Sequence, residues 1–399
     1  MALQSRKFLL SLAVVAISGG KLFSQGSRDT TIILINDFTA QVECTDALAD
    51  MYDYKFDKAE REMRALKVKY GWHPLPYFLL GLNEWWKIMP DTKNTSHDAV
   101  FFNYMDSAIL IADNLYKNYP QYKIEAAFFL AAAYGFKGRL YADEERKNWL
   151  KAFSVGKEAL NYLDVCKQKN NLSPELLFGD GLYNYFSVWI PENVPSLKPL
   201  MLFFHKGDKK LGLQQLKEVS YNAFYTRIEA MIWLMRICNS YENEQTRAFQ
   251  LAEYLHQTYP DNSYFHRYYA RMLYYRGMYV DLEREANLIL TRIDSGKVGY
   301  EATSGRYASF YLGQLYGIRR NFEAAKKYYL LSIKYAESNG ETDSGYYLYA
   351  LIELGEIAQK QGKKAEATEY FKAVKRKAGR KDEAFKDAKR RLKNLEKGD

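Results

Sequence analysis

A helical hairpin recurs along this chain at a spacing near 34 residues, and about eight copies can be placed between Ala40 and Lys381. The clearest neighbouring copies are Glu229–Asn262 and Ser263–Gly296, which follow each other without a gap. One hairpin of this size cannot bury its apolar side alone, so it must stack on its neighbours in an array. The period therefore predicts an all-α solenoid that occupies most of the chain and leaves little of it for a catalytic domain.

Small residues recur where the two helices of a hairpin must cross closely, and aromatic residues recur opposite them. The seventh copy has Leu312-Gly313 in its first helix and Tyr329 in its second, and the eighth has Leu354-Gly355 and Phe371. This pattern resembles the tetratricopeptide repeat. The resemblance implies an α–α superhelix of about eight helical hairpins. The segment Asp382–Glu396 has apolar residues at spacings of three and four, so we expect it to form a C-terminal capping helix.

The N-terminal segment has the features of an export signal. Arg6 and Lys7 precede the apolar stretch Phe8–Ile17, and Ser24 offers a cleavage site. The stretch is too short to anchor the chain across a bilayer. We therefore expect an exported protein, periplasmic or associated with the outer membrane of a Gram-negative cell.

Five segments are expected along the chain. They are a signal peptide over 1–24, an N-terminal extension over 25–39, hairpins with inserted turns over 40–228, regular hairpins over 229–381, and a basic capping helix and tail over 382–399.

Positive charge is concentrated at the C-terminus. The net charge of +9 falls to +6 without residues 1–24, and residues 372–397 hold twelve Lys or Arg against four Asp or Glu. A basic segment can bind nucleic acid, but export argues against that partner. A solvated closing helix is the commoner explanation, with peripheral contact to an anionic membrane surface as a secondary alternative.

Three N-terminal hairpins fit the period only with extra residues near their inner turns, at Ile88–Asn103, Arg139–Lys147 and Ser187–Lys206. Equivalent turns of a solenoid line up along one edge, so we expect these insertions to form a ridge. The third insertion is unusually apolar for a solvated turn. Its candidate ridge residues are Trp189, Ile190, Phe203 and Phe204. The alternatives are surface turns without a role and a short helix that returns to the core.

Residues 170–260 carry a more specific pattern. It comprises Gly179-Asp180-Gly181-Leu182-Tyr183-Asn184-Tyr185-Phe186, then Pro191, then Gly207-Asp208-Lys209-Lys210-Leu211-Gly212-Leu213. This segment resembles the inclusion-body-clearance tetratricopeptide family, whose eukaryotic members are associated with the outer mitochondrial membrane, and its bacterial relatives. Tyr183, Trp189-Ile190-Pro191 and Lys209 stand where the family has Phe, a Leu-Leu-Pro turn and Arg. The resemblance implies a helical scaffold, and it brings no catalytic residues to transfer.

No residue pattern here is typical of an enzyme. The five His, at positions 73, 97, 205, 256 and 266, lack metal-ligand spacing, and no Walker loop or nucleophile turn occurs. Gly179-Asp180-Gly181 is more typical of close helix packing than of a phosphate cradle, and Asp180 lacks a paired acid or base. We therefore expect no catalytic residue, cofactor or metal ion.

Three cysteines, Cys44, Cys166 and Cys238, are widely spaced and form no C-x-x-C motif. Buried free thiols are the favoured interpretation, and one disulfide plus a spare thiol is the alternative.

Binding has a stronger basis, because the first helices of tetratricopeptide hairpins line a concave face. We carry over to this chain the repeat positions whose side chains point to the concave face. They predict a partner-binding groove formed by Tyr183, Asn184, Trp233, Tyr241, Tyr264, Arg267, Arg271, Tyr274 and Tyr275. Arg binds carboxylates with two hydrogen bonds and Tyr offers rigid contact area, which suits a protein or peptide partner. Alternatively, these rings pack between adjacent hairpins or beneath the inserted ridge.

The sequence thus predicts a noncatalytic scaffold or adaptor for envelope proteins, in assembly or secretion. The rival is a glycan- or peptide-binding protein that uses the aromatic groove.

Overall fold

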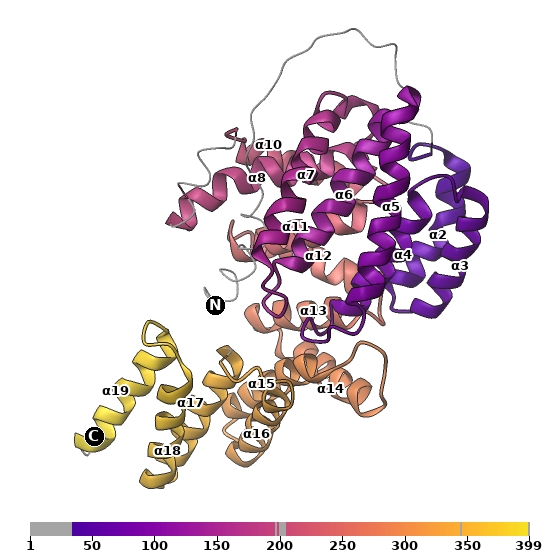
Figure 1. The fold of residues 1–399 in the computed structure, drawn as a ribbon. Helices are drawn as coiled ribbons and strands as arrows, with labels where there is room; N and C mark the ends of the chain where they lie inside the picture. Colours follow the sequence, from indigo (N-terminus) through magenta and orange to yellow (C-terminus); the bar gives the residue numbers. More distant parts are fainter. Residues whose placement is uncertain (1–33, 196–197, 199–204, 344, 398–399) are drawn as a thin grey trace. The chain divides into compact units, whose positions relative to one another are not determined.

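The computed structural model describes residues 34–195, 198, 205–343 and 345–397. Over these residues it contains seventeen α-helices, three short 3-10 helices and no strand. Helices follow one another as eight pairs, and α19 follows the last pair (Figure 1). The predicted all-α array of about eight hairpins with a closing helix is confirmed. The expected signal peptide, residues 1–24, lies outside the described residues, as do Phe203 and Phe204.

The chain divides into two compact units, Met1–Leu251 and Ala252–Asp399. The division lies inside α12, whereas the boundary expected from the sequence, after residue 228, lies at the start of α11. The helices of unit 1 are α2 (Phe38–Tyr52), α3 (Phe56–Tyr70), α4 (Leu75–Ile88), α5 (Asp98–Asn118), α6 (Lys123–Tyr141), α7 (Trp149–Lys167), α8 (Leu177–Asn193), α10 (Lys209–Asn222), α11 (Arg227–Ser240) and the first half of α12 (Gln245–Thr258). The 3-10 helices are η1 (Pro120–Tyr122), η2 (Asn170–Leu172) and η3 (Pro174–Leu176).

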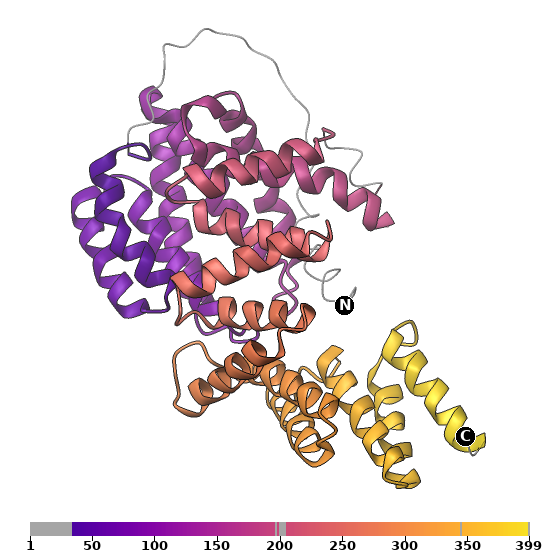
Figure 2. The same ribbon diagram turned by 180° about the vertical axis from the view of Figure 1, so that it is seen from behind.

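Unit 2 continues the same helix-turn-helix order, which Figure 2 shows from behind. Its helices are α13 (Ser263–Tyr275), α14 (Tyr279–Asp294), α15 (Ala302–Ile318), α16 (Phe322–Ser338), α17 (Gly345–Lys360), α18 (Lys364–Lys377) and α19 (Glu383–Lys397).

In unit 2, the Leu-Gly pairs of the seventh and eighth hairpins allow the two helices of each hairpin to cross closely, as predicted. A Cβ atom on Gly313 would lie 2.6 Å from the ring of Tyr329, and one on Gly355 would lie 2.5 Å from the ring of Phe371. Both rings are buried, so each fills the space that its glycine leaves open. Truncation of such a ring to alanine costs about 3–5 kcal/mol, because the cavity collapses only in part.

Polar caps and left-handed glycines set the ends of these helices. The Asn262 side chain accepts a hydrogen bond from the Phe265 backbone N–H, and Asn321 does the same for Ala324. Gly277, with φ +67°, follows α13, because a residue without Cβ adopts this backbone conformation without strain. The short turn that results brings α14 back against α13.

The interior of unit 1 is filled by its own large side chains. Trp86 on α4 donates a hydrogen bond through Nε1 to Glu229 on α11, at 3.2 Å and 143 residues apart. The ring of Tyr52 on α2 meets the ring of Trp86 edge-on, with centroids 5.4 Å apart. The Arg139 guanidinium on α6 lies over the rings of Trp85 and Trp233, 4.5 and 5.3 Å from their centroids. Burial raises the pKa of Glu229, although Arg139 acts in the opposite direction.

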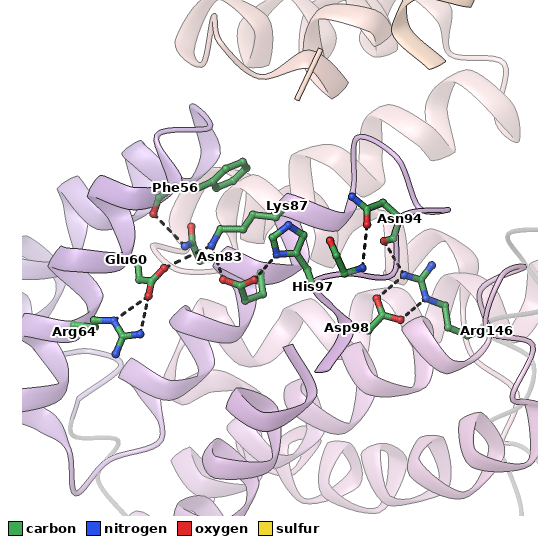
Figure 3. A network of polar contacts seen from close by, with 11 residues as sticks. Phe56, Glu60, Arg64, Asn83, Lys87, Asn94, His97, Asp98 and Arg146 are labelled. Atoms are coloured by element: carbon green, nitrogen blue, oxygen red, sulfur yellow. Dashed lines mark hydrogen bonds and ion pairs between the residues drawn. The ribbon is translucent and has the colours of Figure 1, made fainter. Parts of the chain in front are cut away.

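Two of the three expected insertions meet in space (Figure 3). Arg146, in the turn between α6 and α7, binds the Asp98 carboxylate with Nε at 2.8 Å and Nη2 at 2.5 Å. It also donates to the backbone carbonyls of Thr92 and Asn94, in the turn between α4 and α5. His97 Nδ1, at the end of that turn, lies 2.8 Å from Glu84 Oε2. These contacts hold the first two inserted turns together.

The third insertion begins as helix. Residues 187–193 continue α8, and Trp189 and Ile190 are buried with Phe186 and Trp233 in one apolar cluster. Trp189 and Ile190 therefore lie in a helix that packs into the core, which was the alternative to a solvated ridge.

Candidate functional site

The groove residues expected in unit 1 are engaged within the unit itself. Trp233 is 6% exposed and packs against Phe186, and the ring of Tyr241 lies 4.4 Å from that of Trp189. Asn184 donates to Gln215 on α10 at 2.8 Å. The Tyr183 hydroxyl donates to the His205 carbonyl at 2.7 Å. These contacts contribute to the packing of α8, α10 and α11, and they bury Trp233 and Asn184 while Tyr183 and Tyr241 stay partly exposed.

The glycine pattern in the same region serves a close helix crossing. A Cβ on Gly212 of α10 would lie 2.6 Å from the Tyr185 nitrogen and 2.7 Å from the Gly181 oxygen, both in the backbone of α8. Asp208 caps α10 by accepting hydrogen bonds from the backbone N–H groups of Lys210 and Leu211. The structure thus accounts for the Gly-x-Gly and Gly-Asp elements through packing and capping.

Asp180 is held by neighbours in the same unit. Its Oδ2 accepts from Gln215 Nε2 at 2.6 Å and from Asn170 Nδ2 at 2.9 Å, while Lys167 Nζ lies 3.3 Å from Oδ1. A shallow pocket beside it is lined by residues of η2, η3, α10 and the start of α8, and by Ser173 between the two 3-10 helices. Because both oxygens of the Asp180 carboxylate already have partners within the unit, the arrangement is that of a structural network.

The groove residues expected in unit 2 come together on one helix face. Tyr264, Arg267, Arg271, Tyr274 and Tyr275 all lie on α13, and rings from α15 and α17 adjoin them. We call this set, with Tyr307, Tyr311 and Tyr346, the tyrosine–arginine face. Within it the Tyr274 and Tyr311 rings stack with centroids 4.9 Å apart.

Both arginines of this face interact with tyrosines. The Arg267 guanidinium lies 5.7 Å from the Tyr264 ring and 5.6 Å from the Tyr307 ring, and Nη1 donates to Ser304 Oγ at 3.1 Å. Arg271 donates through Nε to the Tyr275 hydroxyl at 3.2 Å and lies 5.5 Å from the Tyr268 ring. Among the described residues, neither guanidinium has a carboxylate within ion-pair distance.

The tyrosine hydroxyls of the face do not neutralise the two arginines. Tyr311 and Tyr346 bond to each other through their hydroxyls at 3.0 Å, and burial raises the pKa of both. They therefore stay protonated at neutral pH. The face carries two positive charges, framed by neutral hydroxyls and aromatic rings.

The three cysteines are buried and make no disulfide, as the favoured interpretation expected. Burial raises the pKa of each thiol to about 12, which keeps all three in the unreactive protonated form.

The basic C-terminal helix packs its apolar side onto α17 and α18, with Ala388 and Leu395 buried. Lys389 and Lys393 are exposed on its other sides. Over the described part of the chain, no helix has the length and apolar character needed to cross a membrane. Contact with a membrane surface stays a prediction.

Comparisons with known proteins show similarity to solved structures alone: no family model and no curated protein matches. The human IFIT1 dimer with PPP-AAAA is 12% identical, with 84% of this chain and 72% of that chain covered and a TM-score of 0.42. The P58(IPK) TPR domain is 12% identical, with 90% and 98% covered and a TM-score of 0.23. The fold assignment rests on the helical hairpins themselves, and the resemblance of residues 170–260 to the inclusion-body-clearance family stays a prediction.

Proposed function

We propose that this chain is an exported, noncatalytic scaffold or adaptor that binds a protein or peptide partner in the cell envelope, as an accessory factor of assembly or secretion. Export and a periplasmic or outer-membrane location rest on the pattern of residues 1–24. Partner binding rests on the tyrosine–arginine face of unit 2.

The observation that carries the proposal is the pair of arginines without a counter-ion. Arg267 and Arg271 lie one helical turn apart and are partly buried among rings. Removal of a guanidinium from water costs free energy unless a partner compensates it. A carboxylate from a bound segment would supply two charge-assisted hydrogen bonds to a guanidinium, and the tyrosine rings would pack against the segment's apolar parts. An acidic, extended peptide segment is the partner that fits.

A neutral glycan is the rival ligand, since sugar rings pack well on tyrosine. It would leave both guanidinium groups without an anion, so the acidic peptide is favoured. The two ligands predict different salt dependence, because charge pairing weakens as ionic strength rises and apolar stacking does not.

The test measures fluorescence anisotropy of labelled acidic peptides with the whole chain. Arg267→Gln and Arg271→Gln should each weaken binding about tenfold or more, since a hydrogen-bonded charge pair contributes about 1.5–3 kcal/mol. Lys389→Gln, an exposed substitution on α19, is the matched control for net charge. Equal binding by the arginine variants and the wild type would refute the assignment of the face. Saturable neutral-oligosaccharide binding that survives both substitutions would favour the rival.

The natural partner can then be sought by pull-down from an envelope fraction. A stoichiometric protein recovered by the wild type and lost with the double arginine variant would connect the face to the scaffold role.

A further inference from the structure

Three side chains of metal-ligating type meet inside unit 2, although they come from three helices. His256 lies near the end of α12, His266 in α13 and Glu285 in α14, and one ligand atom from each lies within 4.8 Å of the other two. Glu285 Oε2 is 3.0 Å from His266 Nε2 and 3.5 Å from His256 Nε2. Donors around a four-coordinate metal with bonds of about 2.0–2.1 Å stand roughly 3.3 Å apart. The two measured separations bracket that value.

We propose that His256, His266 and Glu285 form a binding site for a divalent transition-metal ion of the zinc class. Two imidazoles and one carboxylate are a donor set that zinc accepts, with the fourth position left to water. The proposal rests on the geometry of unit 2 and is independent of the proposed partner binding.

Side chains around the proposed site orient His266 and Glu285 by hydrogen bonds. His266 Nδ1 lies 2.9 Å from the Tyr300 hydroxyl, which also accepts a hydrogen bond from Arg292. Without a metal ion, His266 Nε2–H donates to Glu285 Oε2. A hydroxyl oxygen has two lone pairs, so Tyr300 can accept from Arg292 and also from Nδ1–H of His266, which is the tautomer that frees Nε2 for a metal. Arg284 Nε donates to Glu285 Oε1 at 3.0 Å, which leaves Oε2 directed at the imidazoles.

The protonation states of the donors also suit a cation. Burial lowers the pKa of His266 to about 4, so this imidazole is neutral at pH 7. Burial works to raise the pKa of Glu285, but hydrogen bonds from His256 and His266 outweigh it and hold that pKa below its usual range. Without a metal ion, the site thus holds an uncharged His266 imidazole beside an ionised Glu285 carboxylate.

His256 is the side chain that must move. Its ring stacks on that of His266, with centroids 4.4 Å apart and planes at 18°, and a metal ion cannot lie in the planes of two stacked imidazoles. The His256 side chain is 12% exposed, and its Nδ1 is buried without a hydrogen-bond partner. Rotation about its side-chain bonds costs Nδ1 no hydrogen bond, although it changes the present contact of Nε2 with Glu285 Oε2. His266, held by Tyr300, stays in place.

The experiment titrates the whole chain with Co²⁺, after purification on a tag without histidine and removal of metals by a chelator. Tetrahedral Co²⁺ absorbs visible light, and Zn²⁺ should displace it. We expect one ion per chain, with affinity reduced about tenfold or more in both His256→Asn and Glu285→Gln.

His97→Asn is the matched control, because His97 also lies beside a carboxylate but in unit 1. It should bind Co²⁺ as the wild type does. Circular dichroism checks that each variant is folded, and the exposed edge of His256 makes His256→Asn the less disruptive change. Lack of saturable Co²⁺ and Zn²⁺ binding by the wild type overturns the proposal, and so does unchanged affinity in a folded His256→Asn variant.

Discussion

Gly212→Ala should destabilise unit 1, because the added methyl group would meet the backbone of α8. The new Cβ would lie 2.6 Å from the Tyr185 nitrogen and 2.7 Å from the Gly181 oxygen. Ordinary carbon contacts are about 3.5–4.0 Å, so the two helices must separate by roughly an ångström. Backbone atoms in the middle of a helix cannot turn aside as a side chain does. The separation also loosens the buried contacts of Leu216 and Tyr185.

The magnitude follows from two opposing effects. Overpacking of this kind costs about 3 kcal/mol. Alanine is a better helix former than glycine by about 0.5–1 kcal/mol, which offsets part of that cost. The net loss is about 2 kcal/mol, or a decrease in Tm of about 4–8 °C for a unit of this size.

Tryptophan fluorescence during thermal or urea unfolding measures this change in unit 1 alone. All six tryptophans of the chain, at positions 72, 85, 86, 149, 189 and 233, lie before residue 251. Gly135→Ala is the matched control, because Gly135 is exposed on α6 and no atom lies within 4 Å of its added Cβ. The control should gain about 0.5–1 kcal/mol. If Gly212→Ala melts at or above the wild-type temperature, the packing explanation for this glycine is wrong.

Two further predictions concern buried titratable groups. A thiol reagent should label none of the three cysteines in the native chain and all three after unfolding, since burial keeps each thiol protonated; fast labelling of the native chain would contradict this. In metal-free protein, unit 2 should lose stability as the pH falls from 6.5 to about 4, because unfolded His266 takes up a proton that the folded residue resists. The expected loss in the free energy of unfolding is about 3 kcal/mol. Calorimetry at several pH values should show a weaker dependence of stability on pH for His266→Asn than for the wild type. If the stability of the wild type does not change over this pH range, burial does not perturb the pKa of His266.

Local features of the sequence were enough to predict the hairpins. The Leu-Gly steps at Leu312-Gly313 and Leu354-Gly355 correctly indicated close packing against Tyr329 and Phe371, because both partners belong to one hairpin. The amphipathic spacing after Asp382 likewise predicted α19. In each case the interacting residues are near in sequence, so a repeat pattern records them.

The residues of the candidate groove could not be predicted from the sequence as reliably as the hairpins. Trp233 and Arg267 were assigned to it by the same positional rule, yet Trp233 is buried beneath Arg139 and Phe186 while Arg267 lies among tyrosines without a carboxylate. A repeat position says which way a side chain points from its own hairpin. It does not say whether a distant helix covers it.

The sequence by itself determined the helical hairpins, their order and their closing helix, because helix periodicity, glycine steps and caps act over a few residues. Only the tertiary structure decided which inward-facing residues are core and which are surface. It also brought His256, His266 and Glu285 together, although they are ten and nineteen residues apart and no motif relates them. The physical reason is that burial and donor geometry depend on how successive helices pack, and that packing is a property of many side chains at once.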